Sequence, residues 1–179
     1  MKRQFPTRLL QLPTDKVDLR RLETKDAPLM LEWMHDDSVT HDLQTDFASK
    51  TMGDALSFIN NSLVDKENLN LAIVNDDDEY MGTVSLKHID GISAEFAITV
   101  RTAAMGKGYS IFAMKEIIRI AHDEYGLQYV YWCVSPDNKR AVRFYDKNGF
   151  ERIGSDKLQI RGSYTPEQIA SYYWYIVRN

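Results

Sequence analysis

Apolar and polar positions follow two different periods along this chain. Alternating or nearly continuous apolar runs predict strands, because successive side chains of a strand point to opposite faces. Apolar residues spaced three and four apart predict amphipathic helices. The predicted strands are residues 17–22, 69–74, 80–88, 94–100, 128–134, 150–153 and 172–177, and the predicted helices are residues 26–34, about 51–64, 109–125, about 138–148 and one turn from 165.

Capping residues and acidic runs mark several boundaries. Thr24 offers a cap ahead of the first predicted helix. Thr165 and Gln168 have the spacing of a capping box, and Gly149 is placed as a helix-ending glycine. The acidic run 75–79 lies between two strands and predicts a solvated hairpin turn without chemistry.

The loop between the fourth predicted strand and the following helix has the composition of an anion-binding turn. Gly106 and Gly108 bracket Lys107, and glycine lets the backbone turn tightly and approach a ligand closely. A helix start normally attracts Asp and Glu, because its free N–H groups carry partial positive charge. Residues 102–114 contain neither, and both Arg101 and Lys107 are basic. This pattern favours phosphate or pyrophosphate binding, with a plain tight turn as the alternative.

Composition narrows the class of protein. The 179 residues are 44% hydrophobic and 27% charged, which fits one globular domain, residues 17–179, after an extended arm, residues 1–16. A formal net charge of −4 argues against bulk nucleic-acid binding. No apolar run approaches the ~20 residues of a membrane span, and the first residues lack the apolar core of a signal peptide. We therefore expect no nucleic-acid partner and no membrane partner.

Cysteine and histidine usage indicates a compartment and argues against a metal. Cys133 is the only cysteine, which excludes an intramolecular disulfide and a zinc site with several Cys ligands and suits the cytoplasm. It lies in a predicted strand with no His near it in sequence, which favours burial in the core over a nucleophile role. The four histidines show no metal-ligand spacing, and we predict no metal.

Two motifs and the order of elements carry a family resemblance. The loop Met105–Ser110 is similar to the pattern Arg/Gln-x-x-Gly-x-Gly/Ala, with Met in place of Arg or Gln and Ser in place of Gly or Ala. Over residues 17–177 the chain resembles the GCN5-related N-acetyltransferase (GNAT) superfamily, most of all the branch with ribosomal-protein and small-molecule amine acetyltransferases. The pattern Asn-x-x-Ala-x-x-x-Tyr-x-x-x-Gly-Phe is matched throughout, by Asn138, Ala141, Tyr145, Gly149 and Phe150.

The resemblance implies a fold and a cofactor. The fold is α/β (α+β): a mixed, mostly antiparallel sheet of about seven strands, flanked by four helices and splayed between strands 4 and 5. The cofactor is acetyl-CoA as acyl donor, and a backbone N–H around residues 98–100 meets the oxyanion. The residues assigned to coenzyme A are Ile98, Thr99, Val100, Met105, Gly106, Lys107, Gly108, Tyr109, Ser110, Asn138, Arg140, Ala141 and Tyr145.

The helical spacing of the second motif indicates which of its residues could contact one ligand. Asn138, Ala141 and Tyr145 are three and four positions apart and share one helix face. Asn138 can hydrogen-bond an amide-bearing ligand such as the pantetheine arm, and Ala141 leaves room for it. Tyr145 can donate a proton to the departing thiolate, since a phenol with a pKa near 10 is protonated at neutral pH. The alternative is a core tyrosine whose hydroxyl is satisfied locally.

Glu95 is the best candidate for a catalytic base. A primary amine with a pKa of about 10 is mostly protonated at pH 7, so a group must accept its proton. Glu95 is a carboxylate inside an otherwise apolar strand next to the glycine loop. It either faces the cleft as a base or faces solvent at the rim, and a chain of water molecules is an alternative base.

The acceptor region follows from the resemblance, in which the first two helices and their connection form one wall of the cleft. The predicted substrate-binding residues are Trp33, His35, Asp36 and Glu95. An aromatic and acidic set of this kind suits a cationic amine or an amino sugar. The alternative is a solvated loop in which Trp33 anchors its helix.

These residues together predict an N-acetyltransferase that acts on a primary amine of a small molecule, of the amino-sugar or polyamine type. The amine attacks the thioester directly in a ternary complex. One alternative acceptor is a protein N-terminus or lysine side chain, and another class of function is a non-catalytic acyl-CoA-binding module. Because many relatives pair, a homodimer is a further expectation.

Overall fold

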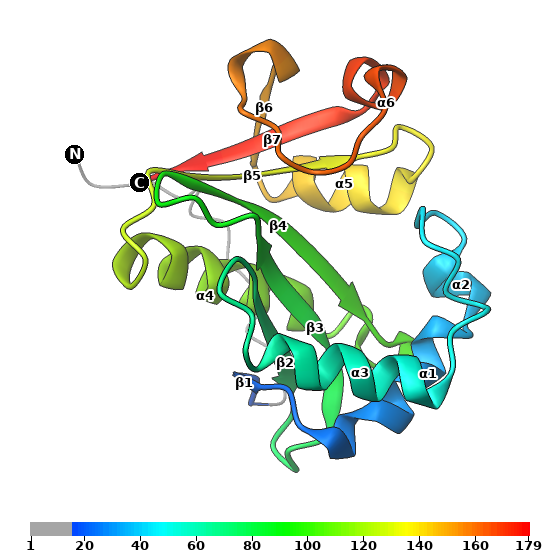
Figure 1. The fold of residues 1–179 in the computed structure, drawn as a ribbon. Helices are drawn as coiled ribbons and strands as arrows, with labels where there is room; N and C mark the ends of the chain where they lie inside the picture. Colours follow the sequence, from blue (N-terminus) through cyan, green and yellow to red (C-terminus); the bar gives the residue numbers. More distant parts are fainter. Residues whose placement is uncertain (1–15) are drawn as a thin grey trace.

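The computed structural model describes residues 16–179, so the predicted N-terminal arm lies outside it except for Lys16. One seven-stranded sheet with the order β1-β2-β3-β4-β5-β7-β6 forms its centre (Figure 1). The strands are β1 (Asp18–Arg21), β2 (Leu69–Val74), β3 (Tyr80–Lys87), β4 (Ser93–Val100), β5 (Tyr129–Val134), β6 (Glu151–Ile153) and β7 (Tyr173–Arg178). The α-helices are α1 (Ala27–Met34), α2 (Asp37–Thr40), α3 (Met52–Ser62), α4 (Tyr109–Asp123), α5 (Lys139–Lys147) and α6 (Pro166–Ser171). Short 3-10 helices are η1 (Thr24–Asp26), η2 (Thr102–Ala104) and η3 (Ser155–Lys157).

The sheet opens between β4 and β5. All neighbouring strands are antiparallel except this pair, which is parallel. The parallel pairing runs only from Ser93–Tyr129 to Glu95–Tyr131, whereas β4 stays paired with β3 as far as Val100. Beyond Glu95 the β5-facing edge of β4 has no strand partner within residues 16–179, and the two strands diverge (Figure 1). The predicted splay between the fourth and fifth strands is confirmed.

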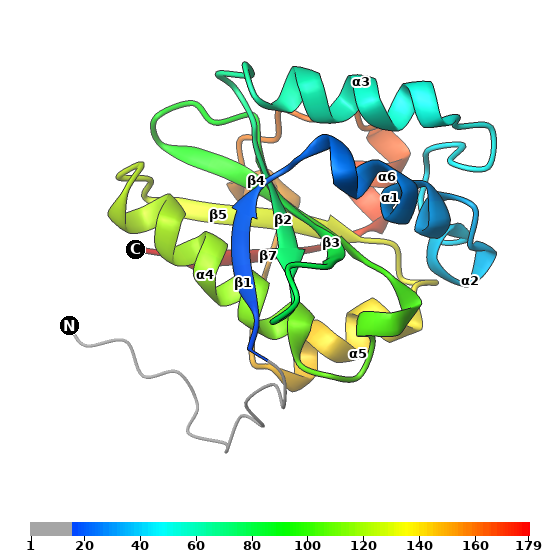
Figure 2. The same cartoon turned by 90° about the horizontal axis from the view of Figure 1, so that it is seen from below.

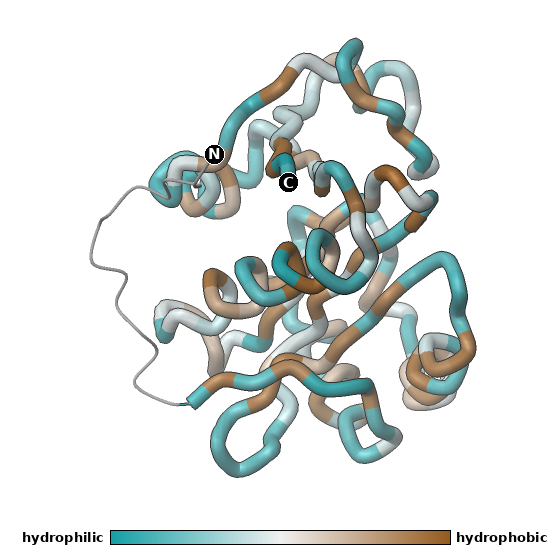
Figure 3. The backbone as a smooth tube through the Cα atoms, turned by 90° about the vertical axis from the view of Figure 1, so that its left-hand side faces the viewer, coloured by the Kyte–Doolittle hydropathy of each residue, from teal (hydrophilic) through white to brown (hydrophobic). Residues whose placement is uncertain are grey.

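Two apolar clusters hold helices on opposite faces of the sheet. Met114 and Trp132 belong to the larger cluster, under α4 and α5, and Met30 and Ile59 belong to the cluster under α1 and α3. Figure 2 shows the sheet between α4 on one side and α1 with α3 on the other. Hydrophilic residues predominate in the peripheral loops, and the helices alternate in hydropathy (Figure 3). In the described part of the chain, no helix has the length and apolar character needed to cross a bilayer.

All seven predicted strands are confirmed, and their bounds differ from the prediction by one residue at most. β6 and β7 complete the mixed sheet that the resemblance implies. Residues 16–179 contain six α-helices, where four were expected to flank the sheet. The two additional helices are short: α6 is the turn predicted from the Thr165–Gln168 capping box, which is present. The four residues of α2 include no buried one, so no apolar stripe reveals this helix in the sequence.

The chain before α1 is capped differently from the prediction. Thr24 lies inside η1, and Glu23 and Asp26 form the capping box instead. Asp26 is 2% exposed, although a carboxylate is costly to bury without a partner. Its partner is Arg20, whose two Nη atoms each lie 2.8 Å from a carboxylate oxygen.

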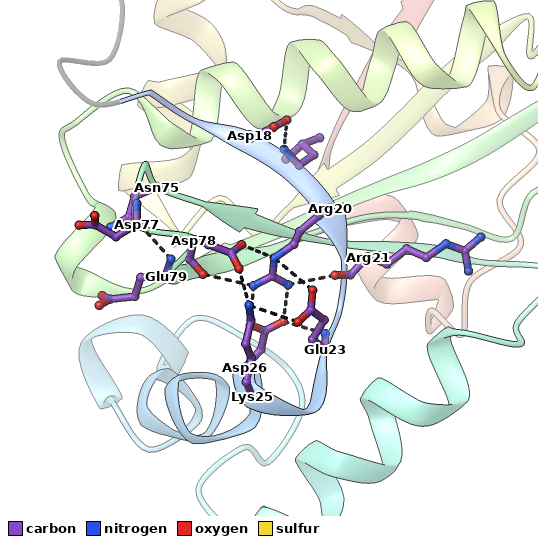
Figure 4. Close-up of polar contacts among 11 residues, drawn as sticks. Asp18, Arg20, Arg21, Glu23, Lys25, Asp26, Asn75, Asp77, Asp78 and Glu79 are labelled. Carbon is purple, nitrogen blue, oxygen red and sulfur yellow. Dashed lines mark hydrogen bonds and ion pairs between the residues drawn. The ribbon is translucent and has the colours of Figure 1, made fainter.

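The acidic turn between β2 and β3 is exposed at residues 76–79, as predicted, and the same arginine also pairs with it. Arg20 Nε donates to Asp78 at 2.6 Å, and Lys25 pairs with Asp78 as well (Figure 4). Glu79 pairs with Arg101 at 2.8 Å. The cations from β1 and η1 lie 58 and 53 residues before Asp78 in the sequence. The local run of acids therefore does not reveal them.

Candidate active site

The loop between β4 and α4 presents unpaired backbone N–H groups at a helix start. Gly106 and Gly108 have φ angles of 74° and 85°, which glycine adopts without strain. Gly108 is the N-cap of α4, whose first turn contains no acidic residue. Within the described chain, the N–H groups of residues 106–108 donate to no acceptor. This arrangement suits an anion, as the composition of the loop predicts.

The sequence predicts that Arg101 and Lys107 both favour an anion at this loop, but the guanidinium of Arg101 pairs with other residues. It is 7% exposed, and its guanidinium donates to Glu32 at 2.9 Å and to Glu79 at 2.8 Å. A third bond, of 3.0 Å, reaches the Tyr80 carbonyl. These contacts tie α1 and the β2–β3 turn to the end of β4. Lys107 is exposed and has no ion pair among residues 16–179, so it is the cation that the loop can offer a ligand.

The other residues assigned to coenzyme A lie along the opening of the sheet. The half-buried Ile98, Thr99 and Val100 occupy the part of β4 that has no partner on its β5 side. Tyr109 is 1% exposed and packs in the larger core, so only its backbone can face a ligand. The remaining loop residues, Met105 and Ser110, are half-buried.

The start of α5 faces the same region from the other side of the opening. Asn138 is the N-cap of α5, and its Oδ1 accepts the N–H of Ala141 at 3.0 Å. The capping bond uses the amide oxygen and leaves the Nδ2 group to donate to a ligand carbonyl. Ala141 is half-buried, and Arg140 is exposed without an ion pair among the described residues.

Tyr145 packs its ring in the core, while its hydroxyl stays unpaired. The residue is 8% exposed, and its ring centroid lies 5.3 Å from that of Trp132 and 5.1 Å from that of Tyr175. The hydroxyl has no hydrogen-bond partner among residues 16–179. The alternative, a core tyrosine whose hydroxyl is satisfied locally, therefore does not describe this residue. Burial raises the pKa of Tyr145 above its usual range. The hydroxyl therefore remains protonated at neutral pH and, although burial makes it a weaker acid than a free phenol, it can donate a hydrogen bond to a departing sulfur.

Glu95 lies on the opposite face of the sheet from α4, at the last pair that joins β4 to β5. It is 6% exposed, so it does not face solvent at a rim. The Tyr164 hydroxyl, from the segment before α6, donates to Glu95 Oε1. His88 Nε2 lies 4.0 Å from Glu95 Oε2. A buried carboxylate with these neighbours can accept a proton from a group that enters the cleft.

Cys133 of β5 lies two residues after Tyr131, the pairing partner of Glu95. Burial raises the pKa of the Cys133 thiol to about 12, so the thiol is neutral at pH 7 and is a poor nucleophile. Glu95 and Tyr164 both lie near this thiol. Tyr145 packs in the cluster on the α4 face of the sheet, whereas Glu95 lies on the opposite face, so the acid candidate and the base candidate lie on different faces of the sheet.

The predicted acceptor residues of α1 and the following loop make contacts of their own. Trp33 is 5% exposed, and its indole N–H donates to the Tyr80 hydroxyl at 3.0 Å, which supports the anchoring alternative. His35 Nε2 lies 2.7 Å from a backbone carbonyl in the segment before α3. Asp36 caps α2 and accepts the Thr102 hydroxyl at 2.6 Å, and these hydrogen bonds lower its pKa. A substrate role for His35 and Asp36 stays a prediction.

Three polar residues that contact Glu95 or bridge to the α6 region were not singled out from the sequence. Gln44 lies in a polar connection, His88 ends a strand, and Tyr164 precedes the capping box at Thr165. None belongs to a motif or to an apolar stripe. Only the pairing of distant segments brings them to the site.

A family model described as acetyltransferase (GNAT) domain matches residues 16–151. A curated relative, the uncharacterized N-acetyltransferase p20 of Bacillus licheniformis, is 26% identical over 148 residues, which are 80% of this chain and 83% of the relative.

Solved structures share the fold at low identity. The spermidine N-acetyltransferase from Vibrio cholerae in complex with CoA and spermine has a TM-score of 0.73 and 20% identity, over 90% of this chain and 95% of that chain. The acetyltransferase of the GNAT family from Bacillus anthracis has a TM-score of 0.72 and 19% identity, over 93% and 97%. Because the family model spans most of the chain, from β1 to the start of β6, the protein belongs to the GNAT acetyltransferase family and is an acyltransferase.

Proposed function

We propose that this protein is an acetyl-CoA-dependent N-acetyltransferase for a primary amine of a small cationic molecule, with linear polyamines as the first class and amino sugars as the second. The observation that carries the small-molecule acceptor is a bridge of side-chain hydrogen bonds between the segment after α2 and the region of α6. Gln168 Nε2 of α6 donates to Gln44 Oε1 at 2.6 Å, and Gln44 Nε2 donates to the Tyr172 hydroxyl. These contacts join segments 124 and 128 residues apart.

The bridge bears on the acceptor because a protein chain needs an open groove, whereas a small molecule fits a closed pocket. In Figure 1 the segment after α2 lies at the open side of the splayed strands, toward α5 and α6. Tyr164, which donates to Glu95, precedes α6, and the bridge residues Gln168 and Tyr172 lie in α6 and directly after it. A small amine beneath the bridge can reach the buried carboxylate. The spermine named with the Vibrio cholerae structure supports the same class of acceptor.

The residues present fit coenzyme A. The N–H groups of residues 106–108 and the Lys107 ammonium suit a diphosphate, and the free edge of β4 over residues 97–100 suits an extended arm with amide groups. Asn138 Nδ2 can bind the same arm from α5. Acetyl-CoA, when bound, supplies the acyl group as a thioester. Residues of this chain then hold protons: Tyr145 carries one for the departing sulfur, and Glu95 accepts one from the amine.

Reversing the charge of the glycine loop tests the cofactor site. Lys107→Glu places a carboxylate between Gly106 and Gly108, where it repels the diphosphate. We expect the Kd for coenzyme A to rise at least tenfold, about 1.4 kcal/mol. Calorimetric titration of the protein with coenzyme A measures this change. Lys66→Glu is the matched control, because it makes the same charge change in the exposed segment before β2, at the other end of the sheet. Equal affinities for the two variants would contradict the assignment.

The acceptor is tested by thiol release from acetyl-CoA against a panel of amines. The panel contains spermidine, spermine, glucosamine, a peptide with a free N-terminus and a peptide with an internal lysine. We expect the polyamines to give the highest kcat/KM and the peptides to give rates near background. Turnover of a peptide above that of every small amine would overturn the small-molecule proposal. Absence of turnover with all of them would leave the protein an acyl-CoA binder rather than a working enzyme.

Assembly and location follow as part of the same proposal. We propose a homodimer or larger homo-oligomer in the cytoplasm. A spermidine N-acetyltransferase from Vibrio cholerae is described as dodecameric, which supports self-association. Sedimentation velocity of the full chain measures the assembly directly.

A further inference from the structure

Three residues from two segments of the chain enclose the carboxylate of Glu95. The Tyr164 hydroxyl donates to Oε1, so this oxygen is occupied. The other oxygen, Oε2, lies 4.0 Å from His88 Nε2. Gly162 lies against it as well, because a Cβ at that position would come within 2.9 Å of Oε2. The segment 162–164 therefore fixes the carboxylate on one side and leaves His88 on the other.

His88 is held in an unusual conformation beside this carboxylate. Its φ angle is 53°, and within residues 16–179 only Asp78 shares a positive φ among the non-glycine residues. The side-chain oxygen of Asn68 accepts the His88 N–H at 3.0 Å and so holds the backbone in place. A backbone conformation of this kind costs about 1 kcal/mol or more, and it occurs in turns and at functional sites. The strain turns the chain at the end of β3.

The imidazole of His88 connects the buried carboxylate with solvent. Its side chain is 38% exposed, whereas the side chain of Glu95 is 8% exposed. No hydrogen bond of residues 16–179 holds the ring in another role. Imidazole can accept a proton at one nitrogen and release one from the other, so it can pass a proton outward.

We propose that Glu95 and His88 form a proton relay for the acceptor amine, with Tyr164 as the positioning residue that fixes Glu95. The proposal rests on the proposed function. An N–H bond of the acceptor ammonium breaks as a bond from that proton to Glu95 Oε2 forms, and the bonding electrons stay on nitrogen as the lone pair that attacks. The proton then passes to His88 Nε2, and the opposite nitrogen, Nδ1, releases its own proton to water. Glu95 is then a carboxylate again, and the neutral His88, left with its proton on Nε2, regains its starting tautomer by proton exchange with water, to which its side chain is 38% exposed.

The burial of Glu95 and the position of His88 explain why the relay has two members. Glu95 is buried, so after each turnover it must return its proton by way of another group. The gap of 4.0 Å to His88 exceeds hydrogen-bond length by about 1 Å, which one side-chain rotation or one bridging water spans. The other titratable or charged groups near Glu95 are Lys87 at the end of β3, Asp90 in the β3–β4 turn, Tyr131 and Cys133 of β5, and Tyr164. Of the side chains around Glu95, only the imidazole carries an acceptor nitrogen and a donor nitrogen on one ring.

Imidazole rescue tests the part of His88. His88→Gly removes the ring, leaves space for a free imidazole, and keeps a backbone that adopts positive φ without strain. We expect kcat with the best amine to fall about tenfold and to recover at least threefold when imidazole is added at tens of millimolar. His88→Asn, which also tolerates positive φ but fills the space, should lose activity without rescue. Wild-type enzyme in the same imidazole is the control.

Two further variants test the positioning of Glu95. Tyr164→Phe keeps the ring on Trp174, whose centroid lies 5.4 Å away, and removes only the hydroxyl. Gly162→Ala introduces a methyl group 2.9 Å from Glu95 Oε2 and 2.6 Å from the Tyr164 ring. Both should lower kcat about tenfold and leave the Kd for coenzyme A unchanged. Gly53→Ala is the control, because its methyl group would meet only Thr51 Oγ1 at 3.5 Å.

The possible outcomes distinguish a failure of the relay from a failure of the proposed acetyltransferase function. If wild-type enzyme acetylates no amine, the proposed function fails. If wild-type enzyme turns over and Glu95→Gln is slow, but His88→Gly keeps full activity at every pH tested, the relay is wrong and the function stands. Loss of activity in His88→Gly that imidazole does not restore would also overturn the relay, because a structural role alone would produce it. Circular dichroism of each variant identifies any that fails to fold. If His88→Gly does not fold, His88→Asn takes its place, because full activity of His88→Asn would also overturn the relay.

Discussion

Replacing Tyr145 by phenylalanine is expected to lower kcat by about 100-fold or more, the usual contribution of a general acid. The change removes one oxygen and leaves the aromatic packing around Trp132 and Tyr175 intact. Removing the hydroxyl breaks no hydrogen bond, because it makes none within residues 16–179. Stability and coenzyme A affinity should therefore be unchanged, and the loss should appear in kcat. Steady-state thiol release with the best amine measures it.

The control for this variant is another tyrosine that loses the same atom. Tyr125→Phe lies just beyond α4, where the residue is 43% exposed, and should keep the wild-type rate. A leaving thiol with a pKa near 8.5 needs a proton least at high pH, so the loss in Tyr145→Phe should shrink as pH rises above that value. Turnover equal to wild type in Tyr145→Phe at pH 7 would remove the acid role. The tyrosine would then be a core residue alone.

Replacing Arg20 by methionine is expected to lower the free energy of unfolding by about 3 kcal/mol, because a buried carboxylate is left without its partner. Arg20 makes two bonds of 2.8 Å to Asp26, which is 2% exposed, and one of 2.6 Å to Asp78. Methionine keeps most of the apolar stem of the arginine. Urea unfolding followed by tryptophan fluorescence gives the change as a lower midpoint.

Two companions make this stability experiment specific. Arg21→Met removes an exposed arginine from the next position of β1, and should change the free energy of unfolding by about 0.5 kcal/mol or less. The double variant Arg20→Met with Asp26→Leu removes both charges, so it should regain part of the loss. If the double variant is less stable than the sum of its single changes, the cost comes from packing and not from the unpaired charge.

The candidate site was predictable where its residues lie in one local pattern. Gly106, Lys107 and Gly108 form a turn whose composition shows in a few residues. Asn138 and Tyr145 share a face because their spacing matches the turn of a helix. The ring of Tyr145 is more buried than its predicted role alone suggests, since the spacing does not show that Trp132 and Tyr175 surround it.

Other residues had roles that no local pattern contains. Arg101 is basic and lies next to an anion-binding loop in sequence, yet Glu32 and Glu79 occupy its guanidinium. Trp33 is aromatic and lies in the predicted acceptor wall, yet its ring is enclosed by the second core. In both cases the partner comes from a distant segment, and the partner decides what the side chain can do.

The sequence by itself determined the seven strands, the glycine loop and the helix that carries Asn138 and Tyr145, because each follows from periods and turn residues within about 15 positions. The tertiary structure decided that Tyr164 and His88 lie beside Glu95, that Gln44 contacts the α6 region, and that Arg20 pairs with Asp26 and Asp78. These contacts depend on which strands pair and which loops pack together. The local period of apolar residues predicts the face of an element on which a side chain lies. The long-range pairing of strands and loops determines which residues that side chain contacts.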